Sequence, residues 1–123
     1  MIDYLTLDDL LQIAERYGLP PVRDVGLLDS ASHRPRTSVF GEDAYPTLDE
    51  KVAVLLESIV SNHPLVDGNK RLGWLAAAIM YDVNGVWLEA PDDEAYDLVI
   101  GIAEGRVDYH RSAAALAAWT ATG

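Results

Sequence analysis

The residues best suited to chemistry lie in one thirteen-residue stretch, Asn62 to Trp74, which reads N-H-P-L-V-D-G-N-K-R-L-G-W. Its middle, D-G-N-K-R, stands where we place the start of a helix. Free backbone N–H groups and the helix dipole make such a start a binding site for anions. Gly68 lets a phosphate approach the backbone, and Lys70 and Arg71 add positive charge. These residue types predict a site for nucleotide phosphates.

Two side chains of this stretch could carry out a group transfer. The imidazole of a histidine side chain ordinarily exchanges its proton near neutral pH, so His63 could take a proton from an incoming hydroxyl group. Asp67 suits a magnesium ion shared with phosphate oxygens, and Asn69 offers a side-chain amide. The chemistry would be phosphoryl or nucleotidyl transfer with ATP and Mg²⁺. Two simpler interpretations remain open: G-N-K-R is also typical of a solvated helix start, and a histidine at a helix C-terminus often only complements the dipole.

Composition excludes several classes of protein. A chain of 123 residues without internal repeats fits one domain, residues 1–123. It has no cysteine, which excludes disulfides and thiolate metal sites. The net charge of −11 argues against a general nucleic-acid binder and favours a basic protein partner. We find no leader peptide and no apolar stretch of membrane-spanning length, so we expect a cytoplasmic protein.

Helical periodicity and capping signals predict six helices and an all-α fold. The capping box T-L-D-E, from Thr47 to Glu50, opens one of them. The helix from Asn69 has no charged residue between Leu72 and Met80, so we predict that it is the central helix. Val86 to Leu88 is too short to assign. The predicted helices cover about residues 6–17, 24–33, 48–62, 69–84, 91–105 and 109–119, and residues 34–46 form a loop or a short flap hairpin.

Other conspicuous residues have structural interpretations. We predict that Trp74, Tyr81 and Trp87 are core aromatic residues. Arg23-Asp24 is interpreted as a helix cap with a local ion pair. The acidic run Asp92-Asp93-Glu94 is typical of a helix N-terminus.

The stretch from His63 to Arg71 resembles the signature of the Fic/Doc family, which begins H-x-F-x-[D/E]-G-N in its Fic form, and most closely the Doc (death-on-curing) toxin branch. Further landmarks of small Doc-like proteins are R-D-x-G-L-L from Arg23, Y-P-T-L from Tyr45, and Asn84-Gly85. The resemblance covers nearly the whole chain. It implies a compact helical fold, with the motif between two central helices and a flap at about residues 37–45 that aligns a target protein.

The resemblance also implies an activity. Fic proteins transfer AMP from ATP to a hydroxyl, whereas Doc toxins bind ATP in the reversed sense and phosphorylate a threonine of elongation factor Tu, which arrests translation. Lys70 stands where the Fic form has glycine, as in Doc. The resemblance assigns these roles: His63 is the base, Asp67 the magnesium ligand, Arg71 a catalytic cation, and Gly68, Asn69, Lys70 and Arg71 the phosphate cradle.

By the same resemblance, the partner is the C-terminal segment of a Phd-type antitoxin. We place its groove near His63, between the first two helices, the Pro20-Pro21 link and the flap. The chain also departs from the family pattern, with Leu65 for the usual phenylalanine and Trp74 for the second Fic arginine. Leu72-Gly73 replaces the commoner T-A, and Leu75 replaces a polar residue. These departures favour the alternative of a non-catalytic protein that acts through protein contacts. A Fic-type AMP transferase is a further alternative, which Trp74 disfavours.

Overall fold

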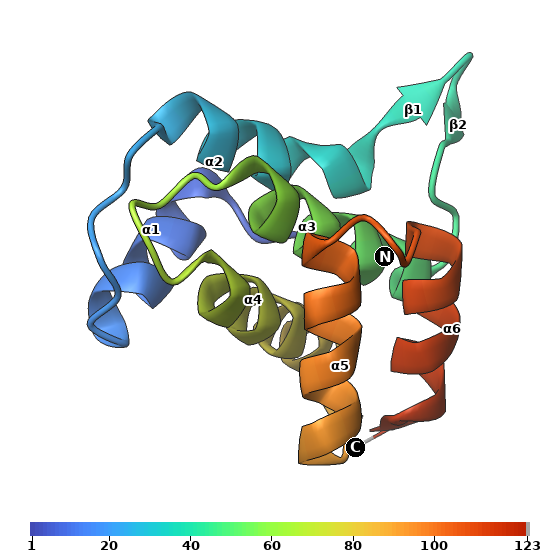
Figure 1. Ribbon diagram of the computed structural model, residues 1–123. Coiled ribbons are helices and arrows are strands. Elements are labelled where there is room, and N and C mark those ends of the chain that lie inside the picture. The colour runs from blue at the N-terminus through green and yellow to red at the C-terminus, as the bar shows by residue number, and fades with distance from the viewer. Residues whose placement is uncertain (123) are drawn as a thin grey trace.

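The computed structural model describes residues 1–122, and over this range it contains six α-helices (Figure 1). They are α1 (Leu7–Arg16), α2 (Val25–His33), α3 (Leu48–Asn62), α4 (Asn69–Val83), α5 (Asp92–Ala103) and α6 (Tyr109–Ala118). A 3-10 turn, η1 (Arg34–Arg36), follows α2, and the strands are β1 (Ser38–Val39), β2 (Glu42–Asp43), β3 (Val86–Leu88) and β4 (Thr120–Thr122). The predicted mostly helical fold is confirmed. Within these residues, no helix is long and apolar enough to cross a bilayer.

Local capping sets the first residue of two helices. The Thr6 hydroxyl accepts a hydrogen bond from the backbone N–H of Asp9 at 3.2 Å, and the Asp9 carboxylate accepts one from the N–H of Thr6 at 2.8 Å. Thr47 and Glu50 form the same reciprocal pair at the start of α3. Each pair satisfies two N–H groups that the first turn of a helix leaves free. This explains why these helices begin close to where the sequence predicts.

The central helix is α3 and not α4, so that prediction was wrong. Every residue of α3 from Lys51 to Val60 is buried except Glu57, and α3 packs against α2, α4, α5 and α6. In α4, Trp74 and Leu75 remain partly exposed. A run without charges does not require full burial, because apolar side chains still supply much of a folded protein's surface.

Helices α3 and α4 approach closely at Gly73. A Cβ atom at this position would lie 2.8 Å from Cγ2 of Val60 and 3.0 Å from Cδ1 of Leu56. Glycine therefore allows the two helices that flank the loop 63–68 to pack directly on each other, which fixes the two ends of that loop.

The segment that was too short to assign forms β3, which pairs antiparallel with β4 so that Trp87 lies opposite Ala121. Successive side chains of a strand point to opposite faces, and Trp87 points outward with 59% of its surface exposed. The prediction that Trp87 belongs to the core was therefore wrong. Tyr81 is fully buried, as predicted, whereas Trp74 is only partly buried.

Candidate functional site

His63 ends α3 in the left-handed backbone conformation, with φ 52° and ψ 58°. This conformation is uncommon for residues other than glycine, although histidine is among the types that adopt it more often. The residue is exposed. The turn at His63 sends the chain across one side of the molecule to the start of α4 (Figure 1).

Arg23 holds this turn from the far side of the loop. Its Nε and one terminal nitrogen donate to the carbonyl oxygen of His63 at 3.1 and 2.6 Å, and the same terminal nitrogen reaches the carbonyl of Asn62 at 3.4 Å. The last carbonyl groups of a helix lack hydrogen-bond partners within the helix, so the guanidinium of Arg23 supplies the donors that these carbonyls need. Asp24 caps α2 through the N–H of Leu27, as predicted. We predicted that Arg23 forms an ion pair with Asp24. Its guanidinium instead forms hydrogen bonds with the turn at His63.

The loop between α3 and α4 is also tied to residues 21–24 through its backbone. The N–H groups of Arg23 and Asp24 donate to the carbonyl of Pro64 at 2.7 and 3.0 Å, and the N–H of Val66 donates to the carbonyl of Pro21 at 3.0 Å. Leu65 is buried, so it anchors the loop in the core at the position where the family has phenylalanine. These bonds hold the loop in place between the histidine and the start of α4.

Helix α4 begins at Gly68 without a side-chain cap. Gly68 has φ 82°, a backbone conformation that favours glycine, and a Cβ there would make a tight contact of 3.2 Å with Cδ of Pro20. The N–H groups of the first helical turn have no partners within the helix. Lys70 and Arg71 extend from this turn and are exposed. The arrangement is chemically able to bind an anion such as phosphate.

The side chain of Asn69 forms hydrogen bonds with the backbone of the loop. Its Oδ1 accepts from the N–H of Leu65 at 2.8 Å, and its Nδ2 donates to the carbonyl of Leu65 at 3.1 Å. The residue is buried, so this amide shapes the loop. The sequence analysis assigned the amide to phosphate. In this structure, the group of Asn69 that remains suited to such a contact is its backbone N–H.

Asp67 is exposed, and one of its carboxylate oxygens accepts from the N–H of Gly68 at 2.8 Å. Over residues 1–122, no group of three or more histidine or acidic side chains lies close enough to hold a metal ion. An exposed single carboxylate nevertheless fits Mg²⁺, which commonly keeps several waters and binds one or two carboxylates together with substrate phosphates. Asp67 is the residue that would hold it.

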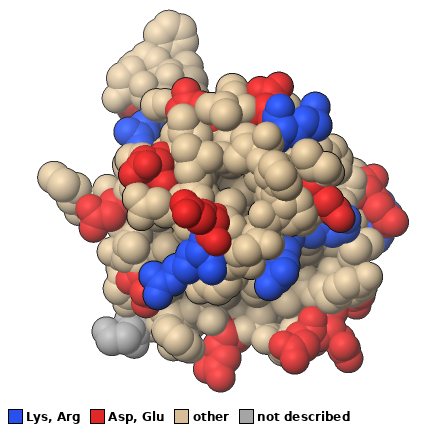
Figure 2. All heavy atoms as spheres, turned by 90° about the vertical axis from the view of Figure 1, so that its left-hand side faces the viewer, with Lys and Arg blue, Asp and Glu red and all other residues tan. Residues whose placement is uncertain are grey.

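Figure 2 shows the face of the molecule toward which this loop extends. Several Lys and Arg side chains lie across the middle of this face and others near its top, with Asp and Glu side chains among and around them. A chain with net charge −11 thus presents local positive charge on this face. Such local charge is what an acidic protein needs to attract a nucleotide.

A short hairpin made of β1 and β2 projects from the fold above α3 (Figure 1), which confirms the predicted flap hairpin. Phe40 and Gly41 form its turn with φ 51° and 81°. A positive φ is unfavourable for a bulky residue such as phenylalanine. The Phe40 side chain is nevertheless fully exposed, so the turn presents an aromatic ring to solvent.

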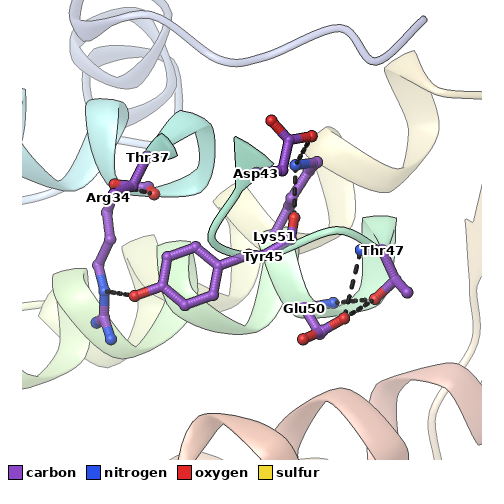
Figure 3. A network of polar contacts seen from close by, with 7 residues as sticks. All are labelled: Arg34, Thr37, Asp43, Tyr45, Thr47, Glu50 and Lys51. Atoms are coloured by element: carbon purple, nitrogen blue, oxygen red, sulfur yellow. Dashed lines mark hydrogen bonds and ion pairs between the residues drawn. The ribbon is translucent and has the colours of Figure 1, made fainter. Parts of the chain in front are cut away.

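A polar network fastens the base of this flap to α3 (Figure 3). Nζ of the fully buried Lys51 donates to the Asp43 carboxylate at 3.2 Å and to the carbonyl of Tyr45 at 2.5 Å. Arg34 donates to the Tyr45 hydroxyl at 3.4 Å and pairs with Glu57 at 2.8 Å. Burial alone would lower the pKa of Arg34, but these two partners outweigh it and raise the pKa. Neither cation is among the residues singled out from the sequence, although a lysine within an apolar helical repeat is a signal for Lys51.

Fold and site together define a class of protein: a small helical protein with a loop of exposed polar side chains between two packed helices and a projecting hairpin. The model of the Fic/DOC family matches residues 4–81, and the chain belongs to this family. Over 125 residues it is 45% identical to the protein named Toxin Doc of Mycolicibacterium smegmatis, and this match covers 98% of the chain and 96% of that protein. The resemblance read from His63 to Arg71 is thereby confirmed.

Proposed function

We propose that this protein is a toxin that transfers the γ-phosphate of ATP to a threonine hydroxyl of elongation factor Tu in the cytoplasm and so arrests translation. The supporting observation is that one loop, held by Arg23, joins His63 to the uncapped start of α4. A base and a phosphate site are thereby kept at opposite ends of a fixed segment.

In this proposal, His63 takes the proton of the threonine hydroxyl as its oxygen attacks the γ-phosphorus. The bond from that phosphorus to the β–γ bridging oxygen breaks, and ADP leaves. Backbone N–H groups at the start of α4, with Lys70 and Arg71, hold the phosphates and stabilise the charge that develops on them. Asp67 would hold a Mg²⁺ ion, which neutralises phosphate charge when it is bound.

Two residues favour phosphate transfer over AMP transfer. Lys70 adds bulk and charge in the first turn of α4, where the Fic form has glycine. Trp74, one turn further along the same helix, replaces the second Fic arginine, a phosphate ligand in the AMP-transfer pose. The phosphate cradle of this chain therefore lacks one phosphate ligand of the Fic form. It also contains Lys70, which obstructs the AMP-transfer pose.

The test uses purified protein, elongation factor Tu, Mg²⁺ and ATP labelled at either the γ or the α phosphate. We expect γ label on elongation factor Tu, no α label, and no label with His63→Ala. Label from the α position would establish the AMP transferase instead. If neither label is transferred to this or any other protein of a cell extract, the non-catalytic alternative holds.

The exposed flap gives a second contact with the target. Phe40 is held in an unfavourable conformation that displays its ring, and Lys51 and Arg34 anchor the flap base beside α3. We propose that the flap binds the threonine-bearing segment of the target and aligns it with His63. Strain at a position with a displayed side chain is typical of a functional contact.

We also propose a partner, the C-terminal segment of a Phd-type antitoxin. A cleft of about 920 Å³ lies between the N-terminal segment, α1 and the second half of α4. It combines apolar side chains such as Ile13 and Ile79 with the acidic Asp9 and Glu15. That chemistry fits a basic amphipathic helix. The cleft lies away from the position near His63 that the sequence analysis predicted, where Pro20 packs against Gly68.

Val83 lines this cleft and is 45% exposed, so it offers a test of the partner site. Wild-type protein should bind the product of the neighbouring reading frame, and binding should weaken as salt rises, because charge complementarity contributes. Val83→Arg should weaken the complex at least tenfold, whereas Ala114→Arg, on the exposed face of α6, should not. Equal binding by both variants would place the antitoxin elsewhere.

A further inference from the structure

The residues before α1 form a strap, residues 2–5, that is fixed at both of its ends. The N–H of Asp3 donates to Oδ1 of Asn84, and Nδ2 of Asn84 donates to the carbonyl of Asp3, both at 2.8 Å. Asn84 directly follows α4, so this pair ties the strap to the end of that helix. At the other end of the strap, Thr6 caps α1 through the two bonds described above. Tyr4 is therefore held between the ends of two helices.

Tyr4 contacts two cations at the base of the flap. The guanidinium carbon of Arg36 lies 5.0 Å from the centre of the Tyr4 ring, and Nζ of Lys51 lies 5.7 Å from it. Arg36 ends η1, directly ahead of the flap, whereas Lys51 binds Asp43 of β2 (Figure 3). Cations within about 6 Å of an aromatic ring are attracted to its face. One ring thus contacts the start of the flap and the residue that anchors its end.

The ring of Tyr4 matters most to Lys51, because the side chain of Lys51 is fully buried. Its ammonium group has three N–H donors, and the Asp43 carboxylate and the Tyr45 carbonyl accept two hydrogen bonds from it. A buried charge is unfavourable unless its surroundings compensate it. If the ring moves away, the ammonium loses part of this compensation. The flap base that Lys51 holds then opens more easily.

Tyr4 also forms part of the wall of the 920 Å³ cleft that we propose for the partner, beside Ile13 and Ile79. A basic amphipathic helix in this cleft brings positive charges to its carboxylates and to the half-buried ring of Tyr4. These charges compete with Arg36 and Lys51 for the same ring, and they repel both cations. Occupancy of the cleft therefore opposes the position that the Tyr4 ring has in this structure.

We propose that Tyr4 couples the cleft to the flap: a basic helix bound in the cleft draws the ring away from Arg36 and Lys51, and this loosens the flap. The inference rests on the partner site of the proposed function and adds the route by which the partner acts on target binding. A ligand shifts such an equilibrium only through its different affinities for the two positions of the ring, and the coupling is reciprocal. A target protein held by the flap therefore weakens binding of the partner.

The first test uses the free protein, without ATP or a target. Hydrogen exchange at the N–H of Ala44 reports opening of the flap, because this group donates to the carbonyl of Thr37 at 2.8 Å. Tyr4→Leu should speed this exchange about tenfold, whereas Tyr4→Phe, which keeps the ring, should not change it. Tyr96→Leu, the same change at an exposed tyrosine of α5, is the matched control and should not change it either. Exchange at the buried Leu55 of α3 should be equal in all four proteins, which checks that the fold is intact.

The second test adds the product of the neighbouring reading frame at a saturating concentration. Exchange at Ala44 should then become about tenfold faster in the wild type, in Tyr4→Phe and in Tyr96→Leu. In the complex of Tyr4→Leu it should be no faster than in the free variant, because the ring that carries the coupling is absent. A tyrosine with a merely structural role would not remove this response to the partner.

Three results would overturn the coupling: a wild-type rate at Ala44 in free Tyr4→Leu, an unchanged rate when the wild type binds the partner, or a slower rate in that complex. The slower rate would mean that the partner covers the flap directly. Failure of the wild type to bind the product, or equal binding by Val83→Arg, would contradict the proposed cleft, and the coupling would fall with it. Normal binding with an unchanged rate at Ala44 would contradict the coupling alone.

Discussion

The guanidinium of Arg23 donates two hydrogen bonds to the backbone carbonyl of His63, at 3.1 and 2.6 Å, although the two residues lie 40 positions apart in the chain. The bonds bind the backbone of His63 and leave its imidazole free to act on a substrate. In the proposed mechanism, Arg23 is a positioning residue, because it contacts the left-handed turn at His63 and acts on the reaction only through that turn.

Arg23→Met should lower the kcat of phosphate transfer about ten- to a hundredfold, because the His63 imidazole is no longer held in the reactive position. The KM for ATP should stay near the wild-type value, since the start of α4 is unchanged. Arg23→Lys should not restore the rate, because an ammonium cannot reproduce the planar fork. Arg111→Met, at an exposed position of α6, is the matched control. A loss confined to KM would argue against a positioning role.

His63→Ala should reduce transfer by about a hundred- to ten-thousandfold, the range expected when a general base is removed. The free energy of unfolding should fall by about 2 kcal/mol at most, because the exposed side chain can contribute little beyond its interaction with the helix dipole. Labelled ATP and urea unfolding measure the two effects. His110→Ala, also exposed, should change neither. A His63→Ala protein that still arrests growth would contradict the assignment.

Lys70→Gly should slow transfer of the γ-phosphate, because one full positive charge leaves the phosphate site. It should also allow AMP transfer, because the bulk that obstructs that pose is removed. The comparison of α- and γ-labelled ATP on the same target distinguishes the two reactions. An unchanged γ-transfer rate would remove Lys70 from the cradle.

Phe40→Asn should stabilise the protein by about 1 kcal/mol, since asparagine tolerates the left-handed conformation that phenylalanine resists. At the same time it should raise the KM for the target protein without changing ATP affinity, because the displayed ring is lost. Phe40→Leu removes the ring but keeps the strain, so it should raise KM without the gain in stability. If Phe40→Asn modifies the target as well as the wild type does, the flap does not use Phe40.

Tyr81→Phe should destabilise the fold by about 1.5–3 kcal/mol near neutral pH, because the buried Tyr81 hydroxyl donates to the Asp49 carboxylate at 2.6 Å. Burial, and then this hydrogen bond, raise the pKa of Tyr81 well above its usual value near 10. The stabilisation is therefore complete below pH 10 and is lost as the pH rises toward the pKa of the folded state.

Urea unfolding of both proteins between pH 7 and 11 checks this prediction for Tyr81. The gap in free energy should be constant up to about pH 9 and should narrow above pH 10. A gap that stays constant over the whole range would show that the Tyr81 pKa is not raised on folding.

Local sequence was sufficient to determine the helices and the motif. The capping box at Thr47 and the apolar repeat after it predicted α3 with the bounds that the structure shows, Leu48 to Asn62. Capping and helical hydrogen bonds join residues three or four positions apart, so their signals survive in the sequence alone. For the same reason the stretch from His63 to Arg71 could be interpreted as a phosphate site before any fold was known.

Only the tertiary structure decided which distant groups these residues contact. Arg23 bonds with His63 in place of its neighbour, and the buried Lys51 anchors the flap through Tyr45. Trp87 lies on the exposed face of β3, a strand that forms only by pairing with β4 near the other end of the chain. In each case the contact depends on how the helices and strands pack against one another. That packing cannot be inferred from the loop lengths and residue types of any short segment of the sequence. The motif therefore supplied the hypothesis about the chemistry, and the packing of α2, α3 and α4 determined which side chains hold the motif in place.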